Sequence, residues 1–99
     1  MNKQVEIDAA VFQKLLSHLD EHKEVQNIEL MILADFCRNC LAKWMVTAAA
    51  DVGEELDYEA AREKVYGMPY SEWKDKFQTK ATAEQMAAFN ARQEAKKTS

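Results

Sequence analysis

The chain has 99 residues, which is enough for one domain, and 47% of them are apolar, so a small core can be built. The formal net charge of -4 and the lack of any basic run argue against a phosphate-binding, nucleic-acid-binding role. Two glycines and one proline leave little material for tight β-turns, whereas good helix formers dominate. We therefore expect an all-α protein, a small irregular bundle of about five helices in a single domain over residues 1–99.

The longest apolar run, Leu30 to Ala34, is far too short to span a bilayer, and the residues after Met1 do not open a signal-peptide core. These patterns predict a soluble, cytoplasmic protein with no membrane partner. In a reducing cytoplasm, the two cysteines are expected to be thiols, metal ligands or redox groups and not a structural disulfide.

Apolar residues spaced by three and four predict the first two helices. Asp8 can cap a first helix, whose apolar face consists of Val11, Phe12, Leu15, Leu16 and Leu19. A second helix is expected to start at Asn27 and to end at Gly53. This span is long for a helix in a small domain. It is therefore either one continuous helix or two helices with a break near Arg38 and Asn39.

Caps and stop signals predict three shorter helices in the second half. Asp57 precedes a helix over residues 58–66, which Gly67 and Pro69 end. Pro69 then starts a short helix that places Tyr70, Trp73 and Phe77 on one face. Thr82 and Gln85 form a capping box for the last helix. Residues 1–7 and 93–99 are expected to fray.

Three blocks of the sequence resemble a known family. They are Val25-Gln26-Asn27-Ile28-Glu29-Leu30-Met31, Phe36-Cys37-Arg38-Asn39-Cys40-Leu41 and Tyr66-Gly67-Met68-Pro69-Tyr70-Ser71-Glu72-Trp73-Lys74. Together they are similar to the bacterial domain-of-unknown-function family 1244, over nearly the whole chain from about Ala9 to Phe89. The resemblance implies a small helical protein of the bacterial cytoplasm and no particular activity. His18 lies in a segment that is similar to the family, whereas a histidine at the position of His22 is not a feature of that resemblance.

Two pairs of side chains could bind a metal. Cys37 and Cys40 are three residues apart, and His18 and His22 are four apart, so each pair can project from one helix face. Two thiolates and two imidazoles are a ligand set of tetrahedral zinc sites. Alternatively, both cysteines lie on an apolar stripe and are simply buried thiols. A redox-active dithiol is a third interpretation. Against it, the cysteines of a reactive pair normally lie at the start of a helix, and here the helical spacing of apolar residues begins two turns before Cys37.

The aromatic residues Tyr66, Tyr70 and Trp73 could form a binding surface for a protein partner, since tyrosine and tryptophan dominate binding hot spots. Core packing is the favoured reading of the two, because a protein this small has few other large residues with which to fill its centre. The acidic residues do not assemble into a carboxylate pair, and there is no phosphate loop or nucleophile elbow. The pattern thus favours a non-catalytic interaction or adaptor protein, with a possible homodimer, over an enzyme. The alternative is a zinc-binding or thiol-based protein centred on Cys37 and Cys40.

Overall fold

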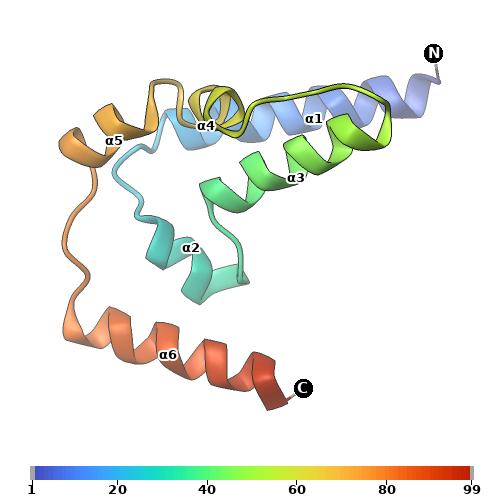
Figure 1. Cartoon of the computed structure of the whole chain (residues 1–99). Coiled ribbons are helices and arrows are strands. Elements are labelled where there is room, and N and C mark those ends of the chain that lie inside the picture. The colour runs from blue at the N-terminus through green and yellow to red at the C-terminus, as the bar shows by residue number, and fades with distance from the viewer. Residues whose placement is uncertain (1, 99) are drawn as a thin grey trace.

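The computed structural model describes residues 2–98, apart from the side chain of Thr98, and these residues form six α-helices (Figure 1). The helices are α1 (Lys3–Asp20), α2 (Asn27–Ala34), α3 (Arg38–Asp51), α4 (Tyr58–Tyr66), α5 (Tyr70–Lys76) and α6 (Ala83–Thr98). The part of the chain so described contains no strand. The all-α prediction is confirmed, with six helices in place of about five.

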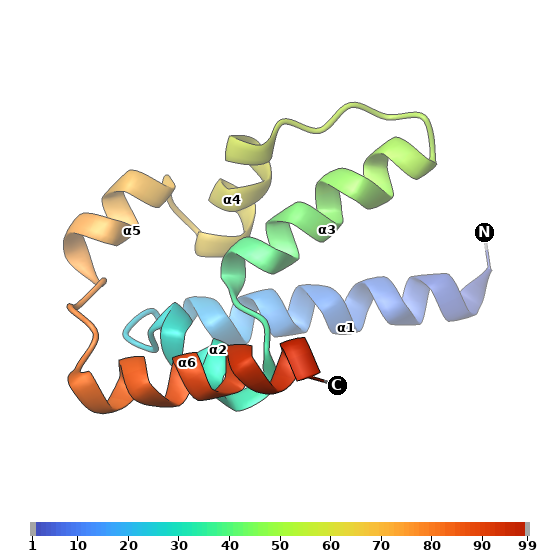
Figure 2. The same cartoon turned by 60° about the horizontal axis from the view of Figure 1, so that its bottom comes forward.

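The helices form two arms that meet at one end of the molecule (Figures 1 and 2). In one arm α4 contacts α1, α3 and α5, and in the other α6 packs along α2. Both termini lie on the side where the arms are apart (Figure 1). The radius of gyration is 15.2 Å, compared with about 13 Å for a compact domain of this length. The chain is therefore an open fold and not a closed bundle.

The long predicted second helix is two helices, α2 and α3. Asp35 takes the left-handed conformation (φ 62°), and its N–H donates to the carbonyl of Met31. Aspartate tolerates this conformation better than most residues do. Cys37 is then extended (φ -146°) and forms the N-cap of α3. The break therefore lies at residues 35–37, just before the predicted position.

Both ends of the described chain are helical, and the expectation that they fray stays a prediction. Helix α1 starts at Lys3 and not after Asp8, because the side chain of Asn2 accepts a hydrogen bond from the N–H of Gln4 at 2.8 Å. At the other end α6 continues to Thr98, and Lys96 forms an ion pair with Asp35 at 3.4 Å. Residues 3–7 and 93–98 are thus helical, while residues 1 and 99, for which fraying was also predicted, lie outside the described residues.

The aromatic cluster forms the centre of the first arm. Trp73 and Tyr66 are 0% and 1% exposed, and their ring centroids lie 5.1 Å apart in an edge-to-face arrangement. The indole N–H of Trp73 donates to the carbonyl of Lys23 at 3.1 Å, which satisfies its one polar atom. The other tryptophan, Trp44, takes no part in this cluster. Trp44 is 57% exposed and stacks instead on Phe36.

Replacing Trp73 with Ala should destabilise the protein by about 3 to 5 kcal/mol, since a large aromatic residue would leave a cavity and the carbonyl of Lys23 would lose a donor. Denaturant titration measures this loss. Trp44→Ala is the matched control, and its cost should be well below that of Trp73→Ala because more than half of Trp44 is exposed. Equal costs for the two variants would contradict the assignment of Trp73 as the core residue.

Candidate functional site

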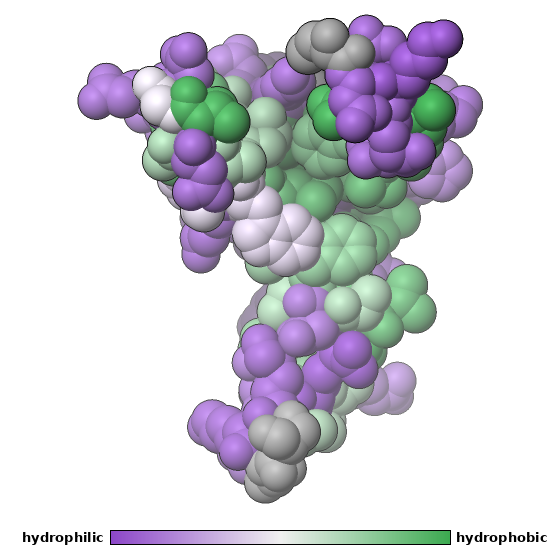
Figure 3. All heavy atoms as spheres, turned by 90° about the vertical axis from the view of Figure 1, so that its right-hand side faces the viewer, coloured by the Kyte–Doolittle hydropathy of each residue, from purple (hydrophilic) through white to green (hydrophobic). Residues whose placement is uncertain are grey.

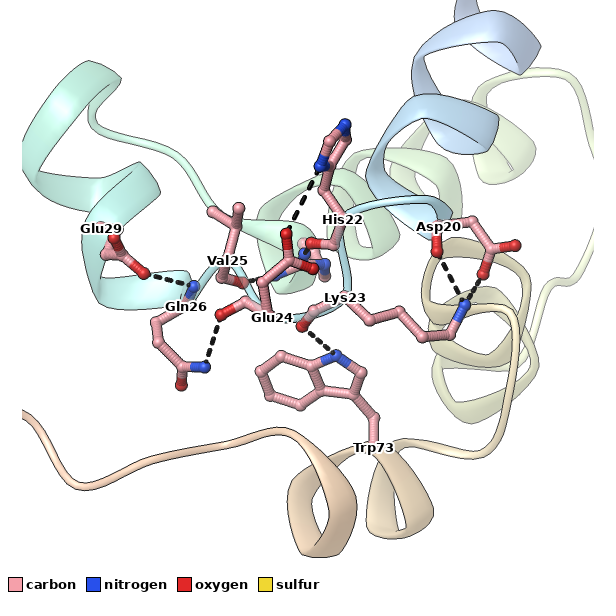
Figure 4. Close-up of polar contacts among 9 residues, drawn as sticks. Asp20, His22, Lys23, Glu24, Val25, Gln26, Glu29 and Trp73 are labelled. Atoms are coloured by element: carbon pink, nitrogen blue, oxygen red, sulfur yellow. Dashed lines mark hydrogen bonds and ion pairs between the residues drawn. The ribbon is translucent and has the colours of Figure 1, made fainter.

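A buried arginine joins the turn after α1 to α2 and α3. Arg38 is 1% exposed, at the start of α3. One terminal nitrogen of its guanidinium, Nη1, donates to the carbonyl of Val25 at 2.7 Å and to Oδ1 of Asn27 at 3.2 Å. The other, Nη2, donates to the carbonyl of His22 at 3.0 Å. Figure 4 shows this turn, with the indole of Trp73 directed at its carbonyls from α5.

Aromatic rings take the place that a carboxylate usually has beside a buried cation. The guanidinium carbon of Arg38 lies 5.2 Å from the ring centroid of Trp73 and 6.0 Å from that of Tyr66. Burial lowers the pKa of Arg38, while the fields of Tyr66 and Cys37 oppose this shift. Three hydrogen bonds and two ring faces therefore stabilise a charge that burial alone would disfavour.

The hydroxyl of Tyr66 links α4 to both neighbouring helices. It donates to Oδ1 of Asn39 at 2.7 Å and accepts from Nδ2 of Asn27 at 3.0 Å. Burial raises the pKa of Tyr66, so the hydroxyl stays protonated and keeps its donor role. Asn27 thereby contacts Arg38 through its oxygen and Tyr66 through its nitrogen.

Gln26 joins the segment after α5 to the start of α2. Its side chain is buried, and Nε2 donates to the carbonyls of Glu24 at 2.9 Å and Phe77 at 2.8 Å. Its Oε1 accepts from the N–H of Thr79 at 2.9 Å, and its own N–H donates to the Glu29 carboxylate (Figure 4). We call Gln26, Asn27, Arg38, Asn39 and Tyr66 the polar junction. These side chains connect the two arms.

Of the three aromatic residues considered for a binding surface, two take the alternative place in the core. Tyr66 and Trp73 are buried in the core, and only Tyr70 is partly exposed. The cause is Arg38, because its guanidinium needs ring faces as well as carbonyls around it. These aromatic residues therefore serve the packing of α4 and α5 against the turn after α1.

The predicted metal ligands form two separate pairs. The sulfur atoms of Cys37 and Cys40 are 3.9 Å apart, and the ring centroids of His18 and His22 are 4.8 Å apart. His22 is exposed, and its Nδ1 lies 3.4 Å from the carboxylate of Glu24. Within residues 2–98 no three histidine, cysteine or acidic side chains gather as a metal cluster would. Zinc binding by all four residues thus stays a prediction, which no contact in the structure supports.

The two cysteines start a helix and do not lie in the middle of one. Cys37 is the N-cap of α3 and is 9% exposed, whereas Cys40, three residues on, is partly exposed. Burial raises the pKa of the Cys37 thiol, and the backbone N–H groups of Cys40 and Asn39 oppose this shift. The sequence argument against a redox pair assumed two helical turns before Cys37, and the break at residues 35–37 removes that objection.

Helix α1 carries two apolar stripes, of which the fold uses one. Leu16 and Leu19 are buried and Phe12 packs against the core. Ile7, Val11 and Leu15, spaced by four, lie on a neighbouring stripe and are 54%, 63% and 37% exposed. We call these three residues the open stripe. The prediction of a single inward face for α1 is therefore correct for the first set and wrong for Val11 and Leu15.

The open stripe is part of a larger excess of surface. Leu33, Trp44 and Val52 are also more than half exposed. Figure 3 views the side on which both termini lie and shows hydrophobic residues gathered in the upper part of the molecule and down to its narrow waist, above the mostly hydrophilic lower part. The accessible surface is 7041 Å², compared with about 5,800 Å² for a compact monomer of this mass. The accessible surface of the chain is therefore about 1,300 Å² larger than this relation gives.

This small, all-helical chain belongs to the protein family of unknown function DUF1244, whose family model matches residues 25–91. The match confirms the resemblance found in the sequence, and it spans the polar junction, both cysteines and most of α6. The comparison with curated proteins gave no match. Among the helices of residues 2–98, none has the length and apolar character needed to cross a membrane.

The polar junction was missed at the level of sequence. Gln26 and Glu29 are three apart, as in a capping box, and this signal was available. Nothing in the sequence around Arg38 distinguishes a buried arginine from a solvated one. Its burial follows from the carbonyls of His22 and Val25, which come from a turn eleven or more residues away.

Arg38→Lys should destabilise the protein by about 2 to 4 kcal/mol, although the charge is kept, because one ammonium group cannot replace the fork that reaches both carbonyls and the two ring faces. Thermal and denaturant unfolding measure the loss. Lys43→Arg is the control, since Lys43 is exposed on the same helix α3 and the exchange should change the stability by less than about 0.5 kcal/mol. A stable Arg38→Lys protein would contradict the role of the junction.

Proposed function

We propose that this protein is a non-catalytic interaction module of the bacterial cytoplasm that works as a homodimer, in which a second copy covers the open stripe of α1. The observation that supports the proposal is the exposure of Ile7, Val11 and Leu15. The neighbouring stripe of α1 already packs in the core of the same chain. A soluble monomer rarely leaves so much apolar surface unpaired, and such patches mark protein interfaces. The two free cysteines fit a reducing compartment.

The size of the excess accessible surface favours a second copy of the chain as the partner that covers it. If each chain covered its excess of about 1,300 Å², the interface would bury about 2,600 Å² in total, which lies in the range of obligate homodimers. A short peptide docked on one stripe would cover much less. The surplus therefore has the size of a subunit interface.

The geometry of α1 suits a symmetric contact. In a twofold dimer the same patch lies on both partners, so a helix pairs with its own copy. The open stripe has three apolar side chains at steps of four along an 18-residue helix, and this spacing suits antiparallel packing of two such helices. Lys14 lies beside the stripe and can keep its charged end in water.

Val11→Glu should convert the dimer to a monomer, because it places a carboxylate at the middle of the apolar contact. Sedimentation equilibrium measures the mass, with the wild type at twice 11.4 kDa and the variant at 11.4 kDa. Circular dichroism checks that the helices remain, as expected for a residue that is 63% exposed.

Gln13→Glu is the matched control, since Gln13 is exposed on the opposite side of α1 from Val11. The control adds the same charge to the same helix and should remain dimeric. A wild type that is monomeric at high micromolar concentration would overturn the proposal. A Gln13→Glu variant that dissociates as readily as Val11→Glu would place the contact elsewhere and contradict the role of the open stripe.

A further inference from the structure

We propose that Cys37 and Cys40 are a reversible dithiol–disulfide pair whose oxidant is a low-molecular-weight disulfide such as oxidised glutathione. Three observations point to this site: the sulfurs are 3.9 Å apart, Cys37 is the N-cap of α3, and Cys40 is the accessible member of the pair. The inference does not depend on the proposed dimer.

The backbone at this point can form the bond. The sulfur atoms of a disulfide are about 2 Å apart. Rotation of the two side chains must therefore shorten the Sγ–Sγ distance from 3.9 Å to that length. Cys37 is the extended N-cap residue, whose carbonyl accepts from the N–H groups of Cys40 and Leu41, and Cys40 occupies the first turn of α3. A Cys-x-x-Cys pair at a helix N-terminus is the arrangement in which reactive dithiols occur. The N-terminal position thus gives the pair the geometry that a mid-helix pair would lack.

The difference in exposure between Cys40 and Cys37 determines which thiol reacts first with the external disulfide. The Cys40 thiolate attacks one sulfur of the external disulfide, which forms a mixed disulfide at Cys40 and releases one thiolate to take up a proton. Cys37 then loses its proton to water, and its thiolate attacks Sγ of Cys40 and expels the second thiolate, which is protonated in turn. Two electrons pass from the pair to the oxidant, and the products are the internal disulfide and two small thiols.

The buried thiol sets the pH dependence of the closing step. Burial raises the pKa of Cys37, and the titratable groups that act on it are the Cys40 thiol and the hydroxyl of Tyr66, while the nearby Arg38 is a fixed charge. Because only the thiolate attacks, the closing rate should keep rising as pH passes through and above the usual cysteine range. At neutral pH the mixed disulfide at Cys40 should therefore persist long enough to be trapped.

The test is oxidation of the folded full-length protein by oxidised glutathione, followed by removal of the oxidant, intact-mass measurement, and alkylation of the remaining thiols after unfolding in urea. The wild type should lose two hydrogens and both alkylatable thiols, and dithiothreitol should restore them. Cys37→Ser should stop as a stable glutathione adduct at Cys40. Cys40→Ser should stay largely unmodified, since its remaining thiol is buried.

Two results would overturn the proposal. In the first, the folded wild type keeps both thiols alkylatable while the same protein in urea is oxidised, which would show that the fold blocks the pair. In the second, the wild type accumulates the adduct at Cys40 at every pH and never closes. Repeating the oxidation with Val11→Glu should give the same disulfide, so that the failure of the dimer and the failure of this site remain distinguishable.

Discussion

The charge of Arg38 is the constraint on which the rest of the fold depends. A guanidinium that is 1% exposed must have its donors satisfied, and the carbonyls of His22 and Val25 do this from a turn that has no regular structure of its own. The turn is thereby fixed in the conformation that offers its carbonyl at Lys23 to the indole of Trp73. Helix α5, only seven residues long, is held by this contact and by the other rings.

The same junction explains why the molecule is open. Its polar side chains connect the arms at one end only, and α6 contacts α2 without closing over α1. Since the centre of the molecule is occupied by a cation and by amides, little apolar surface remains there to draw the arms together. The unused apolar residues are found on α1 and in the upper part of the molecule down to its narrow waist, where a second copy has room to bind (Figure 3).

The sequence predicted what local signals determine and missed what distant contacts determine. Gly67, with φ 72°, ends α4 as its position predicted, and the Thr82–Gln85 capping box starts α6. The break before α3 was placed late, because an apolar period continues through Phe36 and Cys37 while the backbone turns at Asp35. Apolar residues at steps of three and four indicate which face of a helix is buried. They do not indicate at which residue the helix ends.

The candidate sites show the same division. The cysteine pair could be found from its spacing, but its exposure and its place at the N-cap depend on the break. The open stripe was visible as apolar residues and was assigned to the core, because a sequence with two adjacent stripes on one helix does not say which of them has a partner. Tyr66 and Trp73 lie in the core, the location that the sequence favoured, but their contact with a buried cation was not foreseen, because Arg38 is distant from both in sequence.

The most direct test of the account is amide hydrogen exchange over α1 as a function of protein concentration. The first half of α1, residues 3–11, is exposed along its length, so its amides should exchange quickly in the monomer, as in a weakly packed helix. We predict that protection over these residues rises with concentration through the range in which the mass doubles, while protection around Arg38 and Trp73 stays constant. Protection of residues 3–11 that does not change with concentration would contradict the claim that a second copy covers this helix.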